Sequence, residues 1–273
     1  MSALCLTLRE PPARRVDLSP LTADHLAGKT PAQVAALPLR SGNRTVRVDE
    51  LFSLSGASIT EIEIRNACDR LDRIGEGMTH GRILVQGAAG SYLGARMAGG
   101  VIEVQGDAGA YAATGMSGGL IRVSGAVGDF LGAAIPGDQR GMRGGTVLVA
   151  GDAGDRVGDR MRRGLVLIEG RAGDYCASRM LAGTIAVWGP VGRFPGMAMK
   201  RGTLLLRQPP AFLPTFTDSG RQSLGFLSLL VRSWRTLPGR FATIADSQAQ
   251  VQRYMGDLAN DGRGEILVWP WGN

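Results

Sequence analysis

Cysteine and histidine are scarce in this sequence of 273 residues, and their scarcity limits the chemistry that the chain can perform. The three cysteines, Cys5, Cys68 and Cys176, are an odd number without metal-ligand spacing, which argues against a disulfide framework or a zinc site and predicts free thiols. The two histidines, His25 and His80, lie far apart with no serine or cysteine motif beside them. The clustered acids of a polysaccharide-cleaving site are also missing. We therefore expect no catalytic residue and no metal site.

Long apolar runs are lacking as well. No stretch approaches the ~20 apolar residues that a membrane-spanning helix requires, and no cleavable signal follows Met1. The hydrophobic content of 44% is nevertheless ample for a buried core. These features predict a soluble, cytoplasmic protein that is not bound to a membrane.

Lysine is almost absent, because Lys29 and Lys200 are the only lysines among 31 basic residues. The other basic residues are arginines, and the formal net charge is +7. A positive field of this size attracts anionic partners or ligands. However, the arginines are interleaved with 24 acids, and the sequence contains no basic helix, zinc-finger spacing or clustered basic run. We therefore do not expect nucleic-acid binding.

Methionine and glycine, in contrast, recur with a fixed period. Seven methionines each stand three residues before a glycine, and the intervals between successive methionines are 19, 19, 26, 19, 19 and 19 residues. Aliphatic residues, most of them β-branched, follow each glycine at the second and fourth positions, an alternation typical of a short strand. The pairs are Met78 and Gly81, Met97 and Gly100, Met116 and Gly119, Met142 and Gly145, Met161 and Gly164, Met180 and Gly183, and Met199 and Gly202.

When the repeats are aligned, equivalent positions form columns. After each strand come a column of small residues, a column of invariant glycines and, two residues later, a mostly aromatic column. A unit of this size cannot bury its apolar side chains alone and must stack on its neighbours. The period therefore predicts an all-β fold, a right-handed parallel β-helix of about seven 19-residue coils whose equivalent residues lie ~4.8 Å apart. A hexapeptide left-handed helix and a calcium-binding nonapeptide roll require other periods.

The flanking sequences suggest three segments. Residues 1–60 are expected to form an N-terminal α/β segment that caps the repeats or docks on another protein. It should contain a strand near residues 6–8 and a short helix begun by Thr30 and Pro31. Residues 61–207 form the β-helix domain, which starts with a decayed repeat at residues 62–80. Residues 208–273 form a C-terminal helix and tail. We expect Ser219 to cap this helix, and the helix to cover an open end of the coil or to pack against a partner.

The fourth coil carries seven extra residues within 132–143, where the methionine interval is 26 instead of 19. Insertions in a stacked repeat occupy loops on one face. This loop is a candidate docking element.

Three side-chain columns are candidate sites. The methionine column is expected to fill the corner of each coil rather than to bind copper(I). The aromatic column is expected to form a ladder rather than to stack a ligand. Arginines directly before the methionines and acids directly after the glycine column are expected to form exposed ion pairs, although an arginine row can also bind carboxylates. These arginines are Arg96, Arg160 and Arg179, and the acids are Asp129, Asp155 and Asp174.

The unit Gly-x-x-Gly-x-x-x-Gly, as in Gly87, Gly90 and Gly94, resembles a domain that two families share: the C-terminal part of the glutamate synthase large subunit and the C subunit of formylmethanofuran dehydrogenase. The flanks favour the second family. Its N-terminal segment is similar to Asp17-Leu18-Ser19-Pro20-Leu21-Thr22, and its C-terminal segment is similar to residues 256–267. The resemblance covers nearly the whole chain.

This resemblance implies a function. The family occurs in an archaeal molybdenum or tungsten dehydrogenase and in the formyltransferase/hydrolase complex of methylotrophic bacteria. The excess of arginine over lysine and the absence of iron-sulfur cysteines are compatible with the bacterial complex, which is the assignment we choose. There, a formyl group passes from tetrahydromethanopterin to a methanofuran-type carrier and is released as formate. The implied partners are a formyltransferase subunit, an amidohydrolase-type hydrolase subunit and a dehydrogenase-B-like subunit.

This chain would be the non-catalytic scaffold, with no cofactor of its own. The carrier bears glutamates, so Arg96, Arg160 and Arg179 are the residues expected to hold its anionic tail. Two alternatives remain open besides the dehydrogenase: a structural domain of the glutamate synthase kind, and a free-standing β-helix that binds an acidic polymer.

Overall fold

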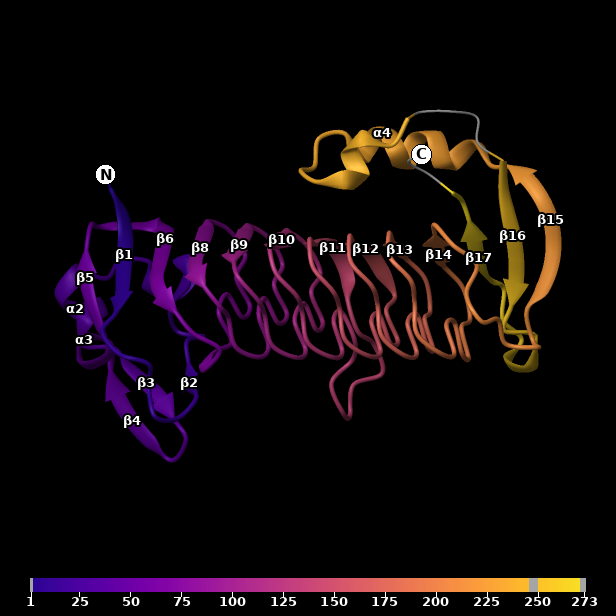
Figure 1. Cartoon of the computed structure of the whole chain (residues 1–273). Coiled ribbons are helices and arrows are strands. Elements are labelled where there is room, and N and C mark those ends of the chain that lie inside the picture. Colours follow the sequence, from indigo (N-terminus) through magenta and orange to yellow (C-terminus); the bar gives the residue numbers. More distant parts are fainter. Residues whose placement is uncertain (1, 246–249, 271–273) are drawn as a thin grey trace.

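The structure is a computed structural model that describes residues 2–245 and 250–270. Its regular elements are mainly strands, which form two sheets (Figure 1). The 13-stranded sheet has the order β15-β16-β17-β14-β13-β12-β11-β10-β9-β8-β6-β1-β5, and the 4-stranded sheet has the order β4-β3-β2-β7. The strands are β1 (Ala3–Leu8), β2 (Val16–Asp17), β3 (Pro38–Ser41), β4 (Arg44–Arg47), β5 (Phe52–Ser55), β6 (Ser58–Ala67), β7 (Leu71–Asp72), β8 (Arg82–Gly87), β9 (Val101–Gln105), β10 (Leu120–Val123), β11 (Arg143–Val149), β12 (Arg163–Ile168), β13 (Thr184–Val187), β14 (Thr203–Leu206), β15 (Thr217–Ser223), β16 (Gln250–Gly256) and β17 (Gly264–Val268). The helices are α1 (Ala23–Leu26), α2 (Pro31–Ala35), α3 (Val48–Leu51), α4 (Gly225–Trp234), η1 (Arg240–Thr243) and η2 (Leu258–Asn260).

Strands β8 to β14 lie side by side in sequence order, all parallel, and their register follows the repeat. Ile83 lies opposite Ile102, and Ile102 lies opposite Ile121. The decayed first repeat fits the same register, because Ile62 pairs with Ile83. A second line of parallel bridges joins the small-residue column from Ala89 onwards. The prediction of a mostly β fold with stacked repeats in one long, mostly parallel sheet is confirmed.

Methionine and glycine recur together because they meet between neighbouring repeats. All seven methionines of the column are fully buried. The Met97 Cε methyl lies 2.7 Å from the position that a Cβ on Gly119 would occupy, and Met142 has the same relation to Gly164. Gly119 also has φ +87°, a left-handed conformation that side chains disfavour. Each methionine therefore fills the space that the glycine of the next repeat leaves empty.

The N-terminal segment contains the two elements that the sequence predicted. The expected first strand is β1, which pairs antiparallel with β5 and parallel with β6. The expected helix is α2, which has Pro31 at its first position. The Thr30 Oγ1 accepts a hydrogen bond from Gln33 N at 3.3 Å, and Gln33 Oε1 accepts one from Thr30 N at 2.8 Å. This reciprocal pair satisfies two donors that a helix start would otherwise leave unpaired.

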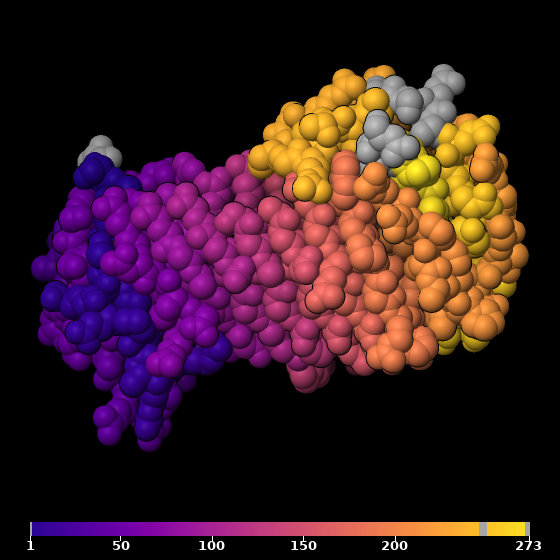
Figure 2. All heavy atoms as spheres, viewed as in Figure 1, coloured from indigo at the N-terminus to yellow at the C-terminus, as the bar shows by residue number. Residues whose placement is uncertain are grey.

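The C-terminal helix differs from the prediction in its start and in its position. Ser219 lies within β15 and does not cap a helix; α4 begins later, after Leu224, and has no side-chain cap. The helix packs on the outer face of the long sheet, where Trp234 joins a buried cluster with Leu167 and Leu205 (Figures 1 and 2). The end of the sheet is instead extended by β17, which pairs parallel with β14, and by the antiparallel strands β16 and β15.

Candidate functional site

The inserted loop projects from the repeats on the side of the molecule opposite α4 (Figure 1). Backbone hydrogen bonds fasten both ends of the loop to the next repeat: Ala134 N donates to Asp159 O at 3.1 Å, and Gly141 N donates to Arg160 O at 2.9 Å. The loop therefore stands on a rigid base, at the place that the repeat interval predicted.

Two hollows flank this loop, and they separate the predicted arginines. One hollow, of about 400 Å³, is lined by Arg96, Arg143 and residues at the loop tip. The other, of about 230 Å³, is lined by Arg160, Arg179, residues 134–138 of the loop and the aromatic column. The three predicted arginines therefore do not form one continuous row.

Each of these arginines has a left-handed backbone, with φ between 51° and 57°, but their side chains differ in what they bind. Arg179 Nε donates to Asp159 Oδ1 at 2.8 Å, and its Nη2 donates to Asp159 Oδ2. Asp159 is only 3% exposed and also accepts a hydrogen bond from Ser178 Oγ at 2.9 Å. The hydrogen bond to Asp159 raises the pKa of Arg179. Arg160 Nη1 donates to Gln139 Oε1 in the loop at 3.1 Å. Arg179 is thus paired with the buried carboxylate of Asp159.

The acid column does not face the arginine column, so the predicted ladder of ion pairs between them is wrong. Instead, each carboxylate accepts a backbone hydrogen bond from the turn of the next repeat. Asp129 Oδ1 accepts from Asp155 N, Asp155 Oδ1 accepts from Asp174 N, and Asp174 Oδ1 accepts from Arg193 N, each at 2.8 Å. Stacking places a backbone N–H above each carboxylate, and these aspartates join neighbouring repeats.

The aromatic column forms the predicted ladder. Tyr111 stacks on Tyr92 at 5.2 Å between ring centroids and on Phe130 at 4.7 Å. Arginines continue the stack where the column lacks a ring, since the Arg156 guanidinium lies 4.5 Å from the Tyr175 ring. The faces of these rings therefore contact neighbouring repeats.

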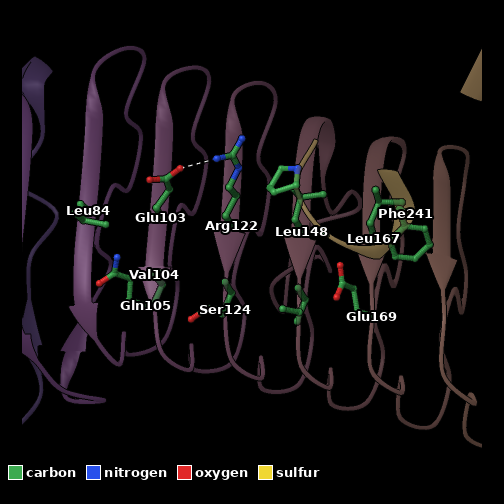
Figure 3. Close-up of a pocket in the computed structure, with 15 residues that line it drawn as sticks. Leu84, Glu103, Val104, Gln105, Arg122, Ser124, Leu148, Leu167, Glu169 and Phe241 are labelled. Carbon is green, nitrogen blue, oxygen red and sulfur yellow. Dashed lines mark hydrogen bonds and ion pairs between the residues drawn. The ribbon is translucent and has the colours of Figure 1, made fainter. Parts of the chain in front are cut away.

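A groove of about 310 Å³ lies on the side of the molecule opposite the inserted loop, on the outer face of β8 to β12 beneath residues 238–241 (Figure 3). Its walls are apolar at Leu148 and Phe241. Hydrogen bonds from Arg82 and Arg122 hold the pKa of Glu103 below its usual range. The Arg122 Nε is buried and has no hydrogen-bond partner. The groove thus has apolar walls beside the ion pair of Arg122 and Glu103, which suits a partner segment with apolar side chains.

Cys176 and His80 carry groups of the kinds that often act in catalysis. Burial raises the pKa of the Cys176 thiol to about 12, so this cysteine is not a ready nucleophile. His80 Nδ1 lies 3.2 Å from Asp24 Oδ1, a contact that ties α1 to the first repeat. Within residues 2–245 and 250–270 no group of three or more His, Cys, Asp or Glu residues is arranged to hold a metal ion. None of the helices in these ranges is long and apolar enough to cross a membrane.

Comparisons with known proteins agree with the repeat and its flanks. The family model described as the GXGXG motif matches residues 72–214. The C subunit of the tungsten-containing formylmethanofuran dehydrogenase 2 from Methanococcus maripaludis is 31% identical over 96 residues, which is 34% of this chain and 35% of that protein. A chain in the crystal structure of the formyltransferase/hydrolase complex (FhcABCD) from Methylorubrum extorquens, determined in complex with methylofuran, is 39% identical, with a TM-score of 0.91. The match covers 97% of this chain and 98% of that one. The chain belongs to the family of formylmethanofuran dehydrogenase C subunits.

Other members of this family match over a shorter region. The C subunit of the molybdenum-containing formylmethanofuran dehydrogenase 1 from Methanosarcina barkeri is 34% identical over 84 residues, or 29% of this chain and 28% of that protein. The matched region spans about a third of the length of these curated relatives.

Proposed function

We propose that this chain is a non-catalytic scaffold subunit of a formyltransferase/hydrolase complex. The complex would move a formyl group from tetrahydromethanopterin to a methanofuran-type carrier and release formate in the cytoplasm. The observation that carries this proposal is the likeness, over 97% of the chain, to a chain of the complex from Methylorubrum extorquens.

The proposed architecture follows from the register. Residues 61–207 would form a right-handed parallel β-helix. Residues 1–60 would form an N-terminal capping or docking segment, and residues 208–273 would form a C-terminal segment that covers part of the β-helix. A rigid rod of this kind presents several faces to partners. The proposed partners are a formyltransferase subunit, an amidohydrolase-type hydrolase subunit and a dehydrogenase-B-like subunit.

Two surfaces are candidates for these partners. The groove under residues 238–241 has apolar walls at Leu148 and Phe241. On α4, Phe226 and Leu229 point away from the sheet and are 42% and 67% exposed. Large exposed apolar side chains and apolar grooves are both typical of protein interfaces.

The carrier's anionic tail is the proposed ligand of Arg96, Arg160 and Arg179. Arg96 and Arg160 are the stronger candidates, because Arg179 already neutralises Asp159. The triple variant Arg96→Gln, Arg160→Gln, Arg179→Gln is expected to retain less carrier in the purified complex. Carrier content equal to that of the unmodified complex would contradict this assignment.

Affinity purification from the native host tests the function itself. A tag on this chain is expected to bring down a formyltransferase and an amidohydrolase in a fixed ratio, as identified by mass spectrometry. A subunit that holds a molybdenum or tungsten cofactor would instead assign the chain to a dehydrogenase, the activity that names its curated relatives. A monomer without partners would contradict both assignments.

A further inference from the structure

Helix α4 carries apolar side chains on two sides, and the sheet covers only one of them. Leu227, Val231 and Trp234 have helical spacing and are buried against the sheet. A second set with helical spacing begins one residue earlier and therefore points about 100° away. We call this set the outer flank of α4: Phe226, Leu229, Leu230 and Ser233.

The outer flank exposes large apolar side chains. Phe226 is 42% exposed and Leu229 is 67% exposed, while Leu230 is half-buried. Figure 1 shows α4 as an outer layer on the long sheet. Apolar residues with this spacing form the stripe through which one helix packs on another. The ten residues of α4 are about 15 Å long at 1.5 Å per residue, which gives a second helix about two turns of contact.

The surroundings of the outer flank are positively charged. Between Asp218 and Asp246 the sequence contains four arginines and no acid. Arg240 pairs with Glu169 at 3.9 Å. Arg235, at the end of α4, is exposed, and within residues 2–245 and 250–270 no carboxylate lies within 4.0 Å of its guanidinium. A binding segment with carboxylates beside its apolar side chains would complement this charge, whereas a second copy of this chain would bring the same arginines to the contact.

We propose that the outer flank of α4 binds an amphipathic helix of a partner subunit, one that carries apolar side chains on one face and carboxylates beside them. This step rests on the function proposed above, because it requires that the chain works within a complex. The partner helix would form a further layer on α4, with its carboxylates near Arg235. Helix α4 would then be buried on two sides, by its own sheet and by the partner.

Photo-crosslinking in the purified complex tests this assignment. The photoreactive residue p-benzoylphenylalanine takes the place of Leu229, and mass spectrometry identifies the segment to which it becomes attached. We expect attachment to one segment of one partner subunit, with apolar residues at helical spacing and aspartates or glutamates between them. Attachment to a second copy of this chain, attachment to a segment without carboxylates, or no attachment to any chain would overturn the proposal.

Leu229→Arg is expected to lower the amount of that partner retained per copy of this chain at least about ten-fold, because a charge would enter an apolar contact. Leu229 is 67% exposed, so the variant is expected to keep the melting temperature of the unmodified chain. The matched control is Leu258→Arg in η2, where the leucine is 55% exposed, and it is expected to change retention less than about three-fold. Equal losses in the two variants would overturn the proposal.

Arg235→Glu tests the charge of the partner helix. Retention of the partner is expected to fall at least about three-fold at low salt, and the difference from the unmodified chain is expected to shrink as salt is raised. The matched control is Arg44→Glu, which reverses the charge of an exposed arginine in β4 and is expected to leave retention unchanged. Full retention with Arg235→Glu would show that the partner does not present carboxylates there, and would overturn the proposal.

Two further outcomes are distinguished from these. Exposed apolar side chains beside arginines also suit an anionic membrane surface, so flotation of the full chain with phosphatidylglycerol vesicles, abolished by Leu229→Arg, would assign the outer flank to lipid and overturn the proposal. A tagged, unmodified chain that brings down no partner would contradict the proposed function itself. That result is obtained before any substitution is made, whereas an intact complex without the expected cross-link contradicts only the assignment of α4.

Discussion

Replacing Gly119 with alanine is expected to destabilise the protein by about 2–4 kcal/mol. The new Cβ would stand 2.7 Å from Met97 Cε and 2.8 Å from Gly100 O, closer than atoms in a packed core allow. It would also be held at φ +87°, where an L-residue is strained. The neighbouring backbone cannot yield without disturbing the strand register. Thermal unfolding should show a melting temperature lower by roughly 5–15 °C.

Gly137→Ala is the matched control for this prediction. Gly137 has a similar φ of +96°, but a Cβ there would have no atom within 4 Å, since the residue lies in the inserted loop. The Gly137→Ala variant therefore has the backbone strain of a positive φ but not the crowding between repeats. Equal melting temperatures for the two variants would contradict the view that methionine and glycine pack against each other.

Trp234→Ala is expected to cost about 3–5 kcal/mol, the usual range for deleting a buried aromatic side chain. Trp234 is fully buried and packs edge-on to Phe241 at 5.3 Å between ring centroids. Its loss would free α4 from Leu167 and Leu205 on the outer face of the sheet. In a repeat protein this damage stays local. Hydrogen exchange should therefore accelerate in α4 and η1 far more than in β8 or β9.

Phe226→Ala serves as the control on the same helix. Phe226 is 42% exposed, so its truncation is expected to change stability by no more than about 0.5 kcal/mol. If both variants accelerate exchange in α4 equally, the helix is not held by the buried cluster.

The repeat was predictable because its columns encode contacts between adjacent units. A residue in one repeat lies against its equivalent in the next, so spacing in the sequence becomes spacing in the sheet, as for Ile83 and Ile102. The same logic located the inserted loop and the stacked Tyr92 and Tyr111. Local signals also sufficed for α2, where Thr30 caps the helix.

The C-terminal segment was not predictable from local pattern. Ser219 has the chemistry of a helix cap, but its segment pairs as β15 with β16 about thirty residues later. Strand β17 likewise joins β14 across the intervening helix α4. Such pairings depend on tertiary contacts that no short window contains.

The candidate site was predictable only in outline. The location of Arg96, Arg160 and Arg179 on one turn of the repeat followed from their shared column, but the engagement of Arg179 by Asp159 depends on side-chain direction.

Co-expression of the proposed complex with and without this chain tests the scaffold role most directly. With the chain present, the formyltransferase and the hydrolase are expected to elute together in size-exclusion chromatography and to release formate from formyl-tetrahydromethanopterin in the presence of carrier. Without it, the two enzymes should separate, each retaining its own half-reaction while coupled formate release falls. Joint elution and unchanged formate release in the absence of the chain would contradict the account.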